Sequence, residues 1–116
     1  MTSGRQAVID RTGLPDLETW QAWRGGLPEL TAPAESLDPA ELRQAMRDAL
    51  ADAQHGQCAL CLYVRALMVM DHDHESGKAR GLLCPGCNTR EGMTAPGASE
   101  VIDAYRANPP AAAVSW

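Results

Sequence analysis

The chain has 116 residues, a formal net charge of −5 and only five aromatic residues, three Trp and two Tyr. This length predicts one domain with a core of limited size, which in small proteins often needs an added staple. No stretch approaches the roughly 20 apolar residues of a membrane span, and no signal-peptide pattern follows Met1. We therefore expect a soluble intracellular protein with no membrane partner, whose cysteines stay reduced.

The first 57 residues read as an N-terminal helical extension. We expect residues 1–14 to be disordered and residues 15–24 to form a short helix that Gly25-Gly26 ends. Its two tryptophans, Trp20 and Trp23, are interpreted as packing anchors, with an exposed contact to a partner or second subunit as the alternative. Residues 25–37 contain two Gly and two Pro and are predicted to be a linker.

The best-marked helix is predicted over about residues 39–54. Asp38 is placed as its N-cap, Pro39 at the first position and Glu41 as the capping-box partner. Its Ala-rich stripe permits close packing on the rest of the domain or on another subunit. His55 at its end is interpreted as a favourable partner of the helix dipole rather than as a metal ligand.

Downstream, the pattern alternates between strand, turn and helix. Residues 64–71 and 79–83 are predicted strands around a turn at residues 75–78, and a short helix is expected from Cys84-Pro85 to Gly92. Ser99 can cap a last helix with Val101, Ile102 and Tyr105 on its apolar side. Asn108-Pro109-Pro110 should end it, and the Ala-rich tail is expected to be frayed.

Two C-x2-C units, Cys58–Cys61 and Cys84–Cys87, stand 22 residues apart. Two such turns can complete a tetrahedron of thiolates around one Zn²⁺ and leave no open position. We therefore predict a structural zinc that joins the residues before the first strand to those after the second. Free or disulfide-bonded cysteines are the alternative.

Acidic, imidazole and amide groups remain between and beside these cysteines. In a strand–turn–strand–helix unit, the end of the first strand lies beside the start of the helix. Asp71 and Asn88 can then supply oxygens to one hard cation such as Mg²⁺. His72 can deprotonate a water there, provided that the strand ends or bends so that adjacent residues face the same site.

Charge argues partly against a nucleic-acid partner. Residues 1–57 carry five basic and nine acidic side chains, whereas residues 58–92 carry four of each. Long-range attraction to DNA should therefore be weak, and any contact would have to be local.

The run DHDHESGKARGLLCPGCN over residues 71–88, preceded by Cys58-x-x-Cys61 and followed by Glu91-Gly92, resembles the recombination endonuclease VII family of phages. That family belongs to the ββα-metal, or His-Me finger, nucleases related to the HNH group. The resemblance covers residues 58–92. The chain departs from the family in its long lead before the first cysteine and in the short segment after Gly92.

The resemblance implies an α+β fold, a zinc-stapled ββα-metal core at 58–92 with additional helices at 1–57 and 93–116. It implies structural Zn²⁺ on the four cysteines, and catalytic Mg²⁺, for which Mn²⁺ can substitute, on Asp71 and Asn88. His72 would be the general base, Glu91 would bind the metal or its water, and His74 would assist at the phosphate. Candidates for DNA backbone contacts, each with a plain surface charge as the alternative, are Lys78, Arg80 and Arg90.

The function that follows is a Mg²⁺-dependent endonuclease on branched or structured DNA, similar to Holliday-junction resolvases, in the cytoplasm of a bacterial or phage-infected cell. A homodimer is expected if the substrate is a symmetric junction, which needs two opposed cuts. Two alternatives stay open. One is an HNH-like nicking or double-strand endonuclease without junction preference. The other is a non-catalytic zinc module in which Asp71, Asp73 and His74 are only turn and capping residues.

Overall fold

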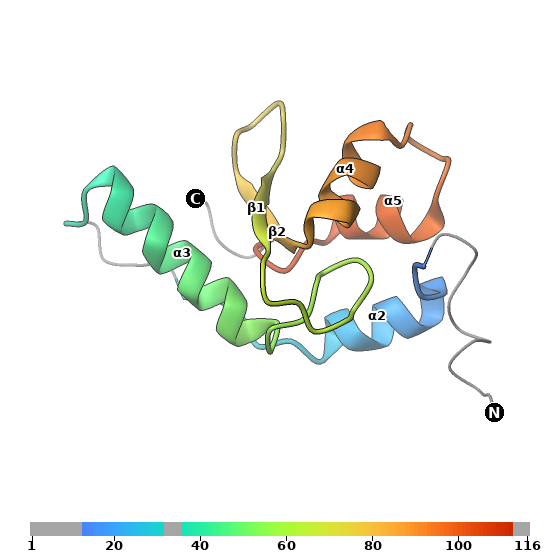
Figure 1. Cartoon of the computed structure of the whole chain (residues 1–116), viewed down its shortest axis with the longest axis horizontal. Coiled ribbons are helices and arrows are strands. Elements are labelled where there is room, and N and C mark those ends of the chain that lie inside the picture. The colour runs from blue at the N-terminus through green and yellow to red at the C-terminus, as the bar shows by residue number, and fades with distance from the viewer. Residues whose placement is uncertain (1–12, 32–35, 113–116) are drawn as a thin grey trace.

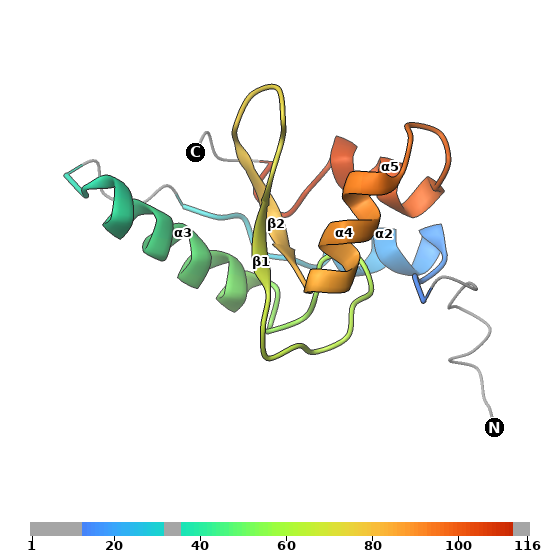
Figure 2. The ribbon, with the colours of Figure 1, turned by 45° about the horizontal axis from the view of Figure 1, so that its top comes forward.

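The computed structural model describes residues 13–31 and 36–112, and Figure 1 shows their arrangement. A two-stranded antiparallel hairpin of β1 (Val69–His72) and β2 (Ala79–Leu83) runs directly into helix α4 (Pro85–Met93). Helix α3 (Pro39–Ala53) lies on one side of the hairpin, and α4 with α5 (Glu100–Ala107) lies on the other in both ribbon views (Figures 1 and 2). Helix α2 (Leu17–Gly25) packs against α5. The expected α+β fold with a strand–strand–helix unit is therefore present.

Helix α3 confirms the predicted capping. The Asp38 side chain accepts the N–H of Glu41, the Glu41 side chain accepts the N–H of Asp38, and Pro39 occupies the first position. Its buried residues, Met46, Leu50 and Ala53, form the stripe that faces the hairpin. The helix ends at Gln54, and the next residue, His55, is exposed with a left-handed φ of 54°.

Helix α2 is held by its tryptophans, as the packing interpretation predicted. Trp20 is 1 % exposed, and its indole Nε1 donates to the carbonyl of Ala59 at 2.8 Å. Trp23 is half buried and donates to Oε1 of Gln57 at 3.2 Å. Both hydrogen bonds reach the segment that carries the first cysteine pair, so they hold α2 against that segment. Residues 1–14 were expected to be disordered or loosely attached, and residues 1–12 lie outside the described residues. The expectation is wrong for Leu14, which is 1 % exposed and packs in the core.

The first strand is shorter than predicted. It starts at Val69, because β2 offers partners only from Ala79 to Leu83. Val64 instead forms an isolated bridge with Gln57, and the residues between leave Val64 and Leu67 exposed. The second strand matches its predicted bounds and is buried throughout.

Helices α4 and α5 begin where their caps predict, at Pro85 after Cys84 and at Glu100 after Ser99.

The chain directly after α5 is packed against the rest of the protein. Ala111 is 1 % exposed and its N–H donates to the carbonyl of Arg80 at 3.0 Å. The expected fraying is therefore wrong for this residue. Gly81 makes room for the returning chain, since a Cβ there would lie 3.1 Å from Cδ of Pro110. Residues 113–116 lie outside the described residues.

None of the helices in the described part of the chain has the length and apolar character needed to cross a membrane.

Candidate functional site

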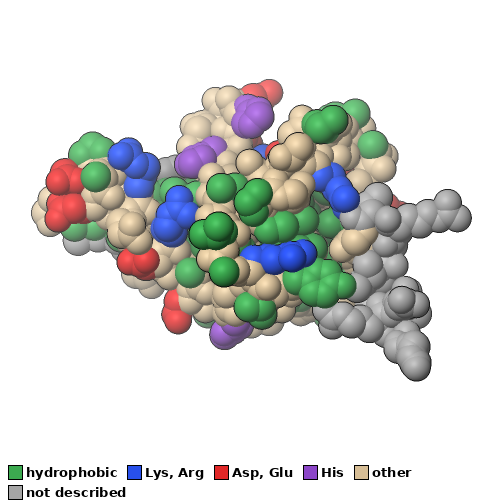
Figure 3. All heavy atoms as spheres, viewed as in Figure 1, with side chains coloured by type: hydrophobic (Ala, Val, Ile, Leu, Met, Phe, Trp, Pro, Cys, Tyr) green, Lys and Arg blue, Asp and Glu red, His purple; other side chains and the backbone are tan. Residues whose placement is uncertain are grey.

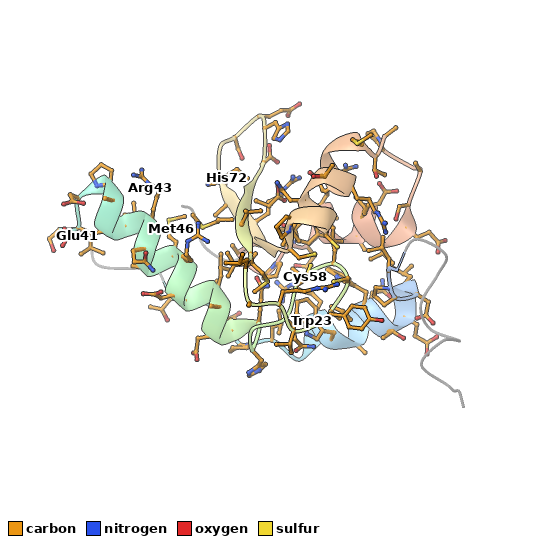
Figure 4. The ribbon with its side chains drawn as sticks, in the orientation of Figure 1. Trp23, Glu41, Arg43, Met46, Cys58 and His72 are labelled. Carbon is orange, nitrogen blue, oxygen red and sulfur yellow. The ribbon has the colours of Figure 1, made fainter. Side chains whose placement is uncertain are left out.

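The four cysteines come together in one buried cluster. Their sulfur atoms all lie within 4.8 Å of one another. The first pair sits in the loop that follows α3, and the second spans the corner between β2 and α4 (Figure 4, where Cys58 is labelled). Backbone N–H groups of Leu60 and Cys84 each donate to Sγ of Cys58 at 3.4 Å. Four sulfurs at such separations can surround one metal ion, and the donor set suits zinc.

The clustered thiols shift one another's pKa values. Hydrogen bonds from Cys58 and Cys87 hold the pKa of Cys61 well below its ordinary value. The bond to Cys61 in turn raises the pKa of Cys58 to about 11, with burial adding to the rise. A 2+ ion would stabilise all four as thiolates, which is the state in which cysteine binds metal.

Asp71 lies on β1 and is 5 % exposed. Its carboxylate accepts two bonds from Arg80, Nε to Oδ2 at 2.8 Å and Nη2 to Oδ1 at 3.1 Å. The hydroxyl of Tyr105, from α5, donates to the same Oδ2 at 2.8 Å. Burial and the negative charge of Asp71 raise the pKa of Tyr105 well above its ordinary value, so the hydroxyl stays protonated as a donor.

Glu91 lies on α4, is also 5 % exposed, and is joined to Asp71 through Arg80. Nη2 of Arg80 is 3.1 Å from Oε2 of Glu91, and Nε of Arg106 is 2.7 Å from the same oxygen. Burial lowers the pKa of Arg80, but its bonds and charge pairing with Asp71, and the charge of Glu91, more than offset this and raise it. One buried guanidinium thus bridges the two acidic side chains that the sequence singled out.

This buried network also includes two residues that the sequence reasoning missed. Tyr105 was expected only as an apolar residue of the last helix, and Arg106 was not considered. Arg106 additionally donates to the carbonyls of Glu91 at 2.7 Å and Thr94 at 2.8 Å, which fastens the end of α4 to α5. No local signal marks either residue, because their partners lie 12 to 34 positions away in the chain.

His72 stands at the end of β1 and is exposed, while the adjacent Asp71 is buried. The register of the hairpin shifts between these two residues, so the strand pairing is irregular at this point. Asn88 is half buried in the first turn of α4, a helix that packs on both strands. Within the described part of the chain, no hydrogen bond engages its side-chain amide.

The turn of the hairpin presents His74 next to a cleft of about 310 Å³. The cleft is lined on the far side by Glu91 and Arg106 and at its base by Arg80. Asp73 is engaged locally, because its Oδ1 accepts the N–H groups of Glu75 at 2.7 Å and Ser76 at 3.1 Å. These bonds lower its pKa and make it a turn residue.

The acidic and imidazole residues do not form a cage of the kind the cysteines form. Among the described residues, the cysteine cluster is the only group of three or more His, Cys, Asp or Glu side chains with ligand atoms so close together. Of the three basic candidates for DNA contact, Lys78 is exposed and Arg90 half buried, whereas Arg80 is 8 % exposed and engaged within the protein.

No solved structure matches the chain. The family model of recombination endonuclease VII matches residues 35–108. The match extends beyond residues 58–92 and takes in α3, the hairpin, α4 and α5. The chain therefore belongs to the recombination endonuclease VII family, and this membership implies an endonuclease that hydrolyses phosphodiester bonds of DNA.

Proposed function

We propose that the chain is a Mg²⁺-dependent endonuclease that cuts branched DNA, with a structural zinc on its four cysteines. One observation carries the proposal. Asp71 and Glu91, which come from the strand and the helix that the cysteine cluster joins, share one buried guanidinium, and two exposed imidazoles border them. Zinc binding by the four cysteines does not itself require these acidic and imidazole side chains.

Zinc at the cysteines would hold the hairpin onto α4. Cys84 is the N-cap of α4 and follows β2 directly, while Cys58 follows α3. An ion on all four sulfurs would therefore tie three elements together at one point. Its role would be structural, because a ring of four thiolates leaves no position for water or substrate.

Asp71 and Asn88 are the residues that would hold Mg²⁺. A carboxylate offers about four lone-pair positions, and Asp71 uses two on Oδ2 and one on Oδ1. Oδ1 therefore keeps one position for a cation, and the unengaged amide of Asn88 can supply a second oxygen. When bound, Mg²⁺ would stabilise negative charge on the scissile phosphate and on the leaving 3′ oxygen.

His72 would act as the general base. Its imidazole is exposed, so a water can reach it, and the neutral ring can accept a proton as that water attacks phosphorus. The bond to the 3′ oxygen then breaks, which leaves a 5′-phosphate and a 3′-hydroxyl. His74, on the cleft, would hold the phosphate, and Glu91 would be a further acidic group that helps to hold the metal or to orient a water beside it.

Cleavage of labelled four-way junctions, compared with their linear duplex arms, tests the proposal. Zinc-loaded protein should cut the junction with Mg²⁺ and not when Mg²⁺ is omitted, and His72→Ala should lower the rate by at least about a hundredfold, the usual size of a general-base contribution. His55→Ala is the matched control, because His55 is another exposed histidine and lies at the end of α3. Zinc content and the unfolding transition should be unchanged in both variants.

Each other outcome has a definite meaning. Equal rates on junction and duplex would overturn the branched-DNA part and favour a nicking or double-strand endonuclease. No metal-dependent cutting of junction, duplex, nicked or single-stranded DNA would overturn the catalytic part. DNA binding that survives Asp71→Ala without any hydrolysis would identify a non-catalytic zinc module.

A further inference from the structure

Helix α3 separates its charges onto different faces. Arg43 and Arg47 are four residues apart and share one face, each three residues before a buried core residue, Met46 or Leu50. The acidic residues Glu41, Asp48 and Asp52 recur at spacings of seven and four and share another face, where all three are exposed. These three acidic side chains of α3 are thus turned away from its arginines.

The arginine face adjoins the hairpin that carries the candidate base. Nη1 of Arg47 donates to the carbonyl of Met68, the residue just before β1, at 3.1 Å. Figure 4 labels Arg43 on α3 and His72 on the hairpin, and both lie toward the viewed face. In the space-filling view of that face, Lys and Arg side chains extend from α3 past the hairpin, whereas acidic side chains gather toward the edges (Figure 3).

A third arginine on the connecting loop is held in a fixed place. Arg65 is exposed, yet its guanidinium lies 5.2 Å from the centre of the Tyr63 ring and 3.7 Å from Sγ of Cys61. Its neighbours Val64 and Leu67 are 75 % and 78 % exposed. Apolar side chains alone would suit a protein partner, but here arginines border them.

We propose that Arg43, Arg47 and Arg65 form a phosphate-binding face that receives a duplex arm of the DNA substrate beside His72. The inference rests on the proposed function and adds to it a surface outside the strand–strand–helix unit. DNA is the occupant that the charges favour, because the helix places its arginines toward the candidate site and its acids away. The net charge of −5 therefore does not exclude DNA binding, since recognition here is local.

The test is equilibrium binding of a fluorescein-labelled duplex and of a labelled junction, measured by fluorescence anisotropy. The buffer contains Ca²⁺ in place of Mg²⁺ and no EDTA, and the salt concentration is varied between about 50 and 200 mM. Arg43→Gln should lower the slope of log K against log salt by about 0.9 and weaken binding about eightfold near 0.1 M salt, the share of one phosphate contact. Arg47→Gln should weaken DNA binding by a similar factor. The unfolding transition of this variant should also be recorded, because Arg47 donates a hydrogen bond to the carbonyl of Met68 and its loss could affect the fold.

A charge-compensated variant is the matched control. Arg43→Gln with Asp52→Asn restores the wild-type net charge but leaves the arginine face incomplete. We expect this double variant to bind as weakly as Arg43→Gln alone. Recovery of wild-type affinity would mean that only net charge matters, and unchanged binding by Arg43→Gln would likewise overturn the proposal. A loss of oligomer mass in Arg43→Gln at unchanged affinity per subunit would assign the face to a second copy instead.

The two proposals fail in distinguishable ways. DNA binding that depends on Arg43 without any metal-dependent cleavage would overturn the proposed function and leave this face intact. Cleavage by wild-type protein with binding insensitive to all three arginines would overturn the face and leave the proposed function intact.

Discussion

Arg80 is the residue on which the two buried acidic side chains converge. The sequence made it a candidate for contact with the DNA backbone, with a plain surface charge as the alternative. Its side chain instead pairs with Asp71 and Glu91 in a region from which water is largely excluded. A buried charge left without a partner is costly, so each member of this network depends on the others.

Tyr105 offers the least invasive probe of that network. Tyr105→Phe removes only the hydroxyl that donates to Asp71, and we expect it to lower the free energy of unfolding by about 1.5–3 kcal/mol, as for a hydrogen bond to a charged group. Urea unfolding of the zinc-loaded protein measures the loss. A double-mutant cycle with Asp71→Asn should show coupling between the two sites. Additive effects would mean that the bond contributes nothing specific.

At the scale of elements, α2 and α5 support the hairpin, α4 and the cysteine loop from outside that part of the sequence. Trp20 joins α2 to the first cysteine loop, Arg24 of α2 donates to the carbonyls of Asn108 and Pro109, and α5 supplies Tyr105 and Arg106 to the buried network. The stability of α2 should therefore affect the whole domain. Its N-cap is Asp16, whose side chain accepts the N–H of Thr19 at 2.8 Å.

Asp16 gives a pH prediction with a defined sign. The hydrogen bond from Thr19 lowers the pKa of Asp16 below its ordinary value of 3.8. A lowered folded-state pKa contributes stability that is present above 3.8 and is lost as pH falls through the folded value. Asp16→Asn keeps a capping oxygen but cannot titrate.

The stability difference between wild type and Asp16→Asn, measured by thermal unfolding, should therefore shrink as the solution is acidified below about pH 4. Taking the difference cancels the acid release of zinc that both proteins share. A difference that does not change with pH would show that folding does not lower the pKa of the capping carboxylate.

For the whole molecule, the cysteine cluster belongs to the larger of two hydrophobic groups of side chains. One packs α2, the cysteines and α5, and the other is a small group around Leu50, Leu82 and Ala111. A core divided in this way, with so few aromatic side chains, should depend on an ion at the point where the elements meet.

Removal of zinc should consequently unfold the chain. Structural zinc contributes roughly 10 kcal/mol or more in small zinc-binding peptides, which is comparable with the whole stability of a domain of this size. We expect one zinc per chain by elemental analysis, and loss of the cooperative unfolding transition after treatment with a strong zinc chelator or in Cys84→Ser. Omission of Mg²⁺ alone should leave the transition intact. A chelated chain that still unfolds cooperatively would contradict a structural role for the ion.

Local chemistry allowed much of the fold to be predicted from the sequence. The capping box of α3, the Ser99 cap of α5 and the second strand each depend on a few neighbouring residues, and the structure confirms them. The two C-x2-C units predicted a shared cluster for a similar reason, because each turn can present its thiols in only a few ways. The start of β1 could not be predicted, since it depends on the length of the strand it pairs with.

By itself, the sequence determined the order of the elements, the cysteine cluster and the family. Only the tertiary structure decided that Arg80 lies between Asp71 and Glu91, that Tyr105 and Arg106 complete this network, and that α3 turns its arginines toward the hairpin. The physical reason is range. Helix caps and C-x2-C turns form between residues a few positions apart. A buried ion network forms only after packing has brought distant helices together and removed the water between them.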